Sequence, residues 1–116
     1  MTAGIYHINI EQGSTYNRTL TYKQSNGNPV NLSGFTAQMH MRKNIDDAAT
    51  VLELSTSNNR ITLGGSNGTI ALTITATDTG NLPAIEGVYD LEINNGSDII
   101  EKVIAGTFTV TKQVTR

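Results

Sequence analysis

The sequence contains no cysteine and no tryptophan among its 116 residues, and only two prolines. Without cysteine, the chain has neither disulfide bonds nor thiolate metal ligands. Charged side chains are also sparse, at 16% of residues, and the formal net charge is −2. A chain without an excess of basic residues lacks the positive field that holds nucleic-acid phosphates, so we expect no nucleic-acid partner.

Long hydrophobic runs are missing as well. No stretch approaches the ~20 apolar residues that a membrane span requires. The first residues also lack the basic and apolar regions of a signal peptide. We therefore expect no membrane partner, and synthesis in the cytoplasm.

Threonine, asparagine and glycine are abundant, and glycine alone accounts for 11 residues. This mixture favours short strands joined by tight turns over long helices. A chain of this length buries a single core, so we predict one domain over residues 1–116.

The clearest strand signal is the stretch NGNPVNLSGFTAQMHMR, residues 26–42. Asn26, Gly27 and Pro29 are typical of a turn, and apolar and polar residues then alternate from Phe35 to Arg42, as in a half-buried strand. Similar patterns predict further strands at Tyr6–Ile10, Thr15–Lys23, Val51–Leu54, Ile61–Leu63, Thr69–Thr75, Val88–Asn94, Asp98–Ala105 and Thr107–Thr111. About eight or nine short strands with regular turns are typical of an antiparallel β-sandwich.

The segments that connect the strands allow more detailed predictions. Ala76–Gly80 predicts one helical turn, because threonine and aspartate cap a first turn and glycine ends it. Asn95-Gly96 predicts a two-residue hairpin turn between the strands on either side, and Gly106 predicts a bulge or a bend. The strand at 69–75 should be central, and the first and last strands should form sheet edges. The side chains predicted to form the core are Phe35, Met39, Ile70, Leu72, Ile74, Tyr89, Leu91 and Phe108.

Reactive groups are few. His7 and His40 lie on the predicted polar faces of strands, with no nucleophile signature nearby, so we interpret both as solvated or interface histidines. The candidate carboxylates are Asp46-Asp47, Asp90 with Glu92, and Asp98 with Glu101, and none has the spacing of a calcium loop. We predict no catalytic, cofactor-binding or metal-binding residue, and we favour a non-enzymatic protein.

The four tyrosines are the remaining candidates for ligand contacts. Tyr6, Tyr16, Tyr22 and Tyr89 fall at inward-facing positions of their predicted strands. Core packing is therefore the favoured interpretation over stacking on sugars.

The order of several segments is similar to a module common in bacteriophage tails, related to the N-terminal domain of siphophage baseplate upper proteins. The matching segments are Gln12-Gly13 with the strand that follows, residues 26–42, YDLEI before an Asn-Gly turn, and the final KVIAGTFTVTKQVTR. The resemblance implies an Ig-like β-sandwich that is a structural component of the virion, with no catalytic residues. Such proteins usually continue into a larger region, so this chain would be the module alone.

The leading hypothesis is therefore a phage tail or baseplate component, present in multiple copies, whose partners are other phage structural proteins. A capsid decoration protein is an alternative within this class, and a carbohydrate-binding module is an alternative of another class. Because terminal strands at sheet edges expose unpaired backbone groups, the candidate subunit contacts are Ile5, His7, Asn9, Lys112 and Arg116.

Overall fold

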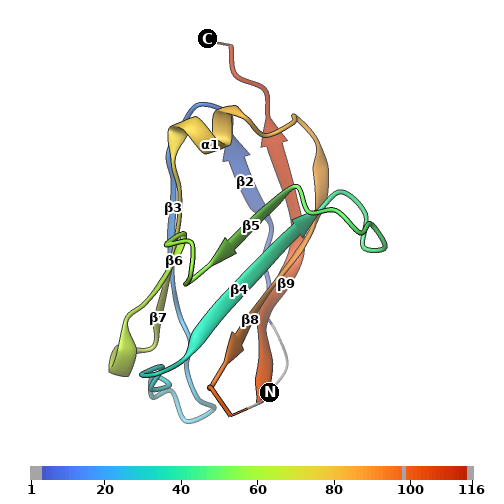
Figure 1. Ribbon diagram of the computed structural model, residues 1–116. Helices are drawn as coiled ribbons and strands as arrows, with labels where there is room; N and C mark the ends of the chain where they lie inside the picture. Colours follow the sequence, from blue (N-terminus) through green and yellow to red (C-terminus); the bar gives the residue numbers. More distant parts are fainter. Residues whose placement is uncertain (1–3, 98, 115–116) are drawn as a thin grey trace.

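The computed structural model describes residues 4–97 and 99–114, which form two packed β-sheets (Figure 1). The larger sheet has the order β1-β9-β8-β4-β5, and β2 also pairs with β9. The smaller sheet has the order β3-β7-β6. The strands are β1 (Gly4–Ile5), β2 (Ile8–Glu11), β3 (Tyr16–Thr21), β4 (Thr36–Arg42), β5 (Leu52–Ser55), β6 (Ile61–Leu63), β7 (Thr69–Ile74), β8 (Glu86–Asn94) and β9 (Ile100–Thr111).

This strand order is that of an immunoglobulin-like sandwich. β3, β7 and β6 correspond to strands B, E and D, and β9, β8, β4 and β5 correspond to G, F, C and C′. The prediction of an all-β sandwich is confirmed. The N-terminal strands β1 and β2 run parallel to β9, unlike the other pairs, which are antiparallel. Most of the chain separates these partners, so the connection is long enough for parallel pairing.

The helical turn predicted at 76–80 is α1 (Ala76–Gly80), which covers one end of the sandwich, opposite the β8–β9 connection (Figure 1). The Asp78 N–H donates to the Thr75 hydroxyl at 3.2 Å, which caps the first turn. The buried Thr79 hydroxyl donates to the Ser14 carbonyl at 2.8 Å. This bond fastens α1 to the turn between β2 and β3. A short 3-10 helix, η1 (Gly65–Asn67), lies between β6 and β7.

Alternating side chains from both sheets meet in the core. β8 shows the pattern most clearly, since its inward positions are buried and its outward positions are half-buried or exposed. Of the predicted core residues, Phe35 is half-buried and packs against the core, and the rest are buried. Tyr22 and Tyr89 are also buried, whereas Tyr6 and Tyr16 are half-buried against the core. Strand β7 is central in its sheet, as predicted.

The C-terminal part of the sandwich differs from the prediction. β9 is one continuous strand that lies between β8 and the N-terminal strands, so the last strand is not a sheet edge. The irregularity in its pairing falls at Val103, because Leu91 pairs with Ile104 and Glu92 with Lys102. Gly106 continues the ladder opposite Tyr89. Glycine is needed there because a Cβ atom would clash with the Tyr6 carbonyl oxygen.

The connection between β8 and β9 is also longer than the predicted two-residue turn. The Asn95 N–H donates to the Ile99 carbonyl at 3.1 Å, so this pair closes the loop. Gly96 has φ of +86°, whereas Asn95 does not have positive φ. The hairpin pairing itself is confirmed, but the turn is not of the type in which both central residues have positive φ.

Candidate interaction site

The outer edge of β2 is open. The Tyr6 N–H donates to the Ala105 carbonyl at 3.2 Å and the Gln12 N–H to the Thr111 carbonyl at 3.0 Å, so the even-numbered residues direct their backbone groups to β9. The odd-numbered residues therefore direct theirs away from the sheet. At His7 and Asn9, the described residues supply no partner for these groups.

The edge of β3 is open on the same side of the sandwich. The Tyr22 N–H donates to the Gly68 carbonyl at 2.8 Å and continues the ladder in which Leu20 pairs with Ile70. Because hydrogen-bonded and non-hydrogen-bonded pairs alternate in an antiparallel ladder, Asn17, Thr19 and Thr21 direct their N–H and C=O groups outward. All three side chains are exposed. β3 is thus an open edge of six residues.

Arg18 of β3 contacts Tyr6, which lies between β1 and β2. Its position has the same parity as the core-facing residues of β3, yet arginine is charged. The guanidinium carbon lies 4.1 Å from the centre of the Tyr6 ring, and cations are attracted to aromatic faces at this distance. The exposed Arg18 therefore stacks on a ring that itself packs against the core.

The opposite side of the larger sheet is protected. In β5, the Glu53 carbonyl accepts from Asn58 Nδ2 at 3.0 Å and from Arg60 Nη1 at 2.9 Å. The Ser55 N–H donates to Asn58 Oδ1 at 2.9 Å. Side chains of the following turn thus occupy the backbone groups with which another strand would pair. The β2 and β3 edges have no such cover among the described residues.

The structure places four of the five predicted contact residues. Ile5 is 91% exposed, and Asn9 is exposed in β2. The ring nitrogens of His7 lie 2.6 Å from the Thr107 hydroxyl and 3.1 Å from the Thr109 hydroxyl, so the imidazole lies over β9. These three residues lie together along one edge, whereas the exposed Lys112 follows the far end of β9. Arg116 lies outside the described residues.

The β3 edge was not among the predicted contacts. The sequence does contain a signal for it, because Asn17, Thr19 and Thr21 alternate with inward-facing residues and contain no charge or proline. The alternation shows which face is exposed. It does not show whether another strand lies alongside, because that depends on the long-range pairing of β3.

The outer face of the larger sheet carries ion pairs. Lys102 Nζ lies 3.2 Å from an Asp90 oxygen, and His40 Nε2 lies 3.7 Å from Glu53 Oε1. Of the candidate carboxylates Asp98 and Glu101, residue 98 lies outside the described residues, and Glu101 accepts a hydrogen bond from the Tyr22 hydroxyl at 2.8 Å. In the described part of the chain, no group of three or more histidine, aspartate or glutamate side chains is placed to hold a metal ion.

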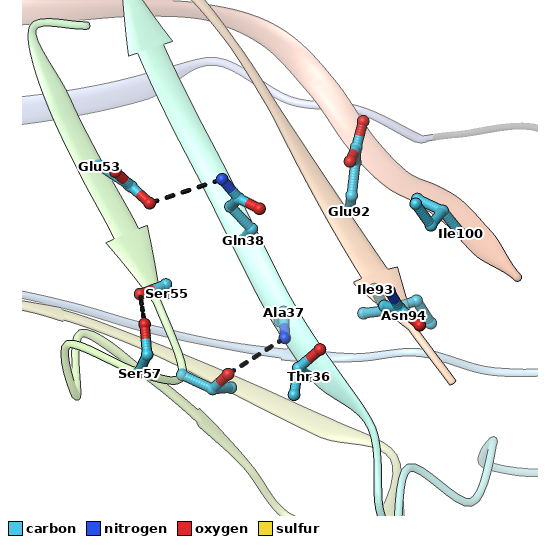
Figure 2. Close-up of a pocket in the computed structure, with 11 residues that line it drawn as sticks. Thr36, Ala37, Gln38, Glu53, Ser55, Ser57, Glu92, Ile93, Asn94 and Ile100 are labelled. Atoms are coloured by element: carbon cyan, nitrogen blue, oxygen red, sulfur yellow. Dashed lines mark hydrogen bonds between the residues drawn. The ribbon is translucent and has the colours of Figure 1, made fainter. Parts of the chain in front are cut away.

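A shallow groove of about 320 Å³ extends over β5, β4, the end of β8 and the start of β9 (Figure 2). Figure 2 shows Gln38 and Glu53 directed toward each other, with Glu92 on the neighbouring strand. The hydroxyls of Ser55 and Ser57 lie 2.9 Å apart at one end. The groove thus offers carboxylates and hydroxyls to a polar ligand, but none of the described residues that line it is aromatic.

No protein-family model matches the sequence, and no curated protein is significantly similar to it. Within the described residues, no helix is long and apolar enough to cross a membrane.

Proposed function

We propose that this chain is a non-enzymatic structural protein of a bacteriophage virion, a tail or baseplate component made in the host cytoplasm. It docks in multiple copies to neighbouring phage structural proteins through sheet edges, termini and loops. The observation that carries the docking is the asymmetry of the edges: β2 is open, whereas side chains cap β5. The sequence resemblance to phage tail modules supports the virion setting.

Strand addition explains how the β2 edge would bind a neighbour. An extended segment alongside β2 would pair with the outward N–H and C=O groups of His7 and Asn9. Ile5 would supply an apolar contact at one end of the segment, since its side chain is 91% exposed. The exposed apolar side chains of Ile45 and Val114 offer further contacts at a loop and near the C-terminus.

Two measurements test this function. The first is mass spectrometry of purified particles from the phage that encodes the chain, in which we expect the protein in multiple copies per particle. Its absence from purified particles would overturn the proposal. Antibody labelling in electron micrographs then distinguishes a tail position from a capsid decoration protein.

The second measurement tests the edge. We expect Ile5→Lys to reduce incorporation into particles by about tenfold or more, because a lysine would leave a charge in the contact. Ile100→Lys is the matched control, since Ile100 is also exposed in the same sheet but is the first residue of β9, whereas Ile5 pairs with Ala105 farther along this strand. Wild-type incorporation of Ile5→Lys would contradict docking at this edge.

The groove in Figure 2 favours one candidate of another class, a carbohydrate-binding module. Its carboxylates and hydroxyls suit sugar hydroxyl groups, although the described lining residues offer no aromatic ring for stacking. A glycan array with the purified protein separates the two classes. Saturable binding that Glu53→Ala and Gln38→Ala abolish would favour the carbohydrate-binding module.

A further inference from the structure

We infer that β3 is a self-association edge, where the same strand of a second copy adds in antiparallel orientation. This inference goes beyond the proposed function because it does not require a virion or another protein. The occupant is a second copy of this chain, for reasons of register, charge and closure.

The register follows from the outward backbone groups. Asn17, Thr19 and Thr21 face the open side, so a two-fold axis at Thr19 pairs this residue with itself in the second copy. Asn17 then pairs with Thr21 of the second copy. This register uses all the outward positions of β3 and places no charged residues opposite each other. Arg18 faces Leu20 of the second copy, and its guanidinium already lies over Tyr6 of its own chain.

The charge of the face also suits a second copy. The outward residues of the smaller sheet are uncharged: Asn17, Thr19, Thr21, Thr62, Thr69, Ala71 and Thr73. Two copies joined at β3 would continue this face without bringing acidic groups together. The ion pairs of Asp90 and Glu53 lie on the other sheet. The net charge of −2 therefore opposes association less at β3 than at the larger sheet.

Closure limits the association at β3 to two copies. An isologous contact at β3 uses the same strand of both partners, so neither copy retains an open β3 edge. The other edge of the smaller sheet is β6, which has three residues. The β5 edge is capped by Asn58 and Arg60. The expected product is a dimer rather than a fibre.

Single-cysteine variants test the register. The chain has no cysteine, so Thr19→Cys introduces one thiol, on the proposed two-fold axis. Paired residues of this kind have Cα atoms about 5.5 Å apart, which a disulfide spans. We expect rapid formation of a covalent dimer under mild oxidation. Thr73→Cys is the matched control, because this residue is exposed on the same face but lies one strand inward, beyond disulfide reach across the axis.

Asn17→Cys mixed with Thr21→Cys should form a heterodimer faster than either forms a homodimer. Equal rates for Thr19→Cys and Thr73→Cys would overturn the inference. Sedimentation over a wide range of concentration tests the wild type, in which we expect a weak dimer.

A second variant separates pairing from folding. Thr19→Pro removes an N–H that points outward, so the bonds between β3 and β7 remain. We expect this variant to lose the dimer while its circular dichroism stays that of the wild type. Thr19→Lys should also abolish the dimer by placing two like charges at the axis. A wild type that is monomeric at every concentration, or a dimer that persists in Thr19→Lys, would overturn the inference.

Discussion

At the scale of single residues, the face of the strand on which a side chain lies decides how much a substitution lowers the free energy of unfolding. Leu72 is fully buried and Thr73 is its exposed neighbour on β7. Leu72→Ala should lower the free energy of unfolding by roughly 2–5 kcal/mol, because it leaves a cavity in the core. Thr73→Ala should change it by less than about 0.5 kcal/mol. Denaturant unfolding measures both, and equal effects would contradict the assignment of the two faces.

Two buried tyrosines should ionise at a higher pH than an exposed tyrosine. Burial raises the pKa of Tyr22 and of Tyr89 to about 12, and for Tyr22 the hydrogen bond to Glu101 adds to this effect. The Tyr89 hydroxyl also donates to the Tyr6 carbonyl at 2.5 Å. Because the folded pKa values exceed the ordinary value of 10, the contribution to stability is complete below pH 10 and is lost as the pH rises through about 12.

Phenolate absorbance during alkaline titration measures this effect. The wild type should show a step near pH 12, and Tyr89→Phe should reduce the amplitude of this step. Ionisation of all the tyrosines in one step near their ordinary pKa of 10 would contradict the burial of Tyr22 and Tyr89.

At the scale of the elements, local patterns specify the strands but not their partners. The alternation in β7 and the capping residues of α1 were sufficient to predict both, because each depends on neighbours within a few residues. The parallel pairing of β2 with β9 joins residues about 100 positions apart, as in the Ile8 and Phe108 pair, so no local pattern contains it. For the same reason, the sequence predicted an edge strand at 107–111, where the structure has an interior one.

The sequence likewise predicted part of the candidate interaction site, namely the open edge, but not the capped one. Ile5, His7 and Asn9 lie on an open edge because β1 and β2 pair with β9 alone, and the sequence predicted an edge strand there. The capping of β5 by Asn58 depends on side chain to backbone bonds across a turn. Such bonds follow from three-dimensional geometry rather than from hydrophobic periodicity.

Arg60 connects β5 and α1, and this link makes the stability of the fold depend on pH in the acidic range. Its Nη1 donates to the Glu53 carbonyl of β5, and its Nη2 lies 2.8 Å from an Asp78 oxygen in α1. The hydrogen bond from Arg60 holds the pKa of the Asp78 carboxyl below its ordinary value of 3.8. Because the folded pKa is depressed, the contribution to stability is present above pH 3.8 and is lost as the pH falls through the folded value.

The thermal midpoint as a function of pH measures this contribution. Asp78→Asn should lower the midpoint at neutral pH and should make the decline in acid less steep. Asp46→Asn, in the exposed loop at 43–49, is the control and should reproduce the wild-type curve. An unchanged curve for Asp78→Asn would contradict the role of the pair.

At the scale of the whole molecule, the two sides of the sandwich have opposite tendencies to associate. β2 and β3 leave backbone groups open on one side, whereas Asn58 and Arg60 cap β5 on the other side of the larger sheet. A module with one open side forms closed contacts, and a module with two open sides forms chains of copies. The cap on β5 therefore keeps this edge of the larger sheet from adding further copies.

Removing this cap should convert a closed assembly into an open one. Asn58→Ala takes away the partner of the Ser55 N–H and one of the two partners of the Glu53 carbonyl, so Arg60 alone still caps β5 and its edge is largely open. We expect light scattering that rises with concentration far above that of the wild type, while circular dichroism at low concentration is unchanged. Ser57→Ala is the matched control, because its hydroxyl contacts the Ser55 hydroxyl rather than the edge backbone. If Asn58→Ala scatters light no more than Ser57→Ala, then the side chain of Asn58 does not protect this edge.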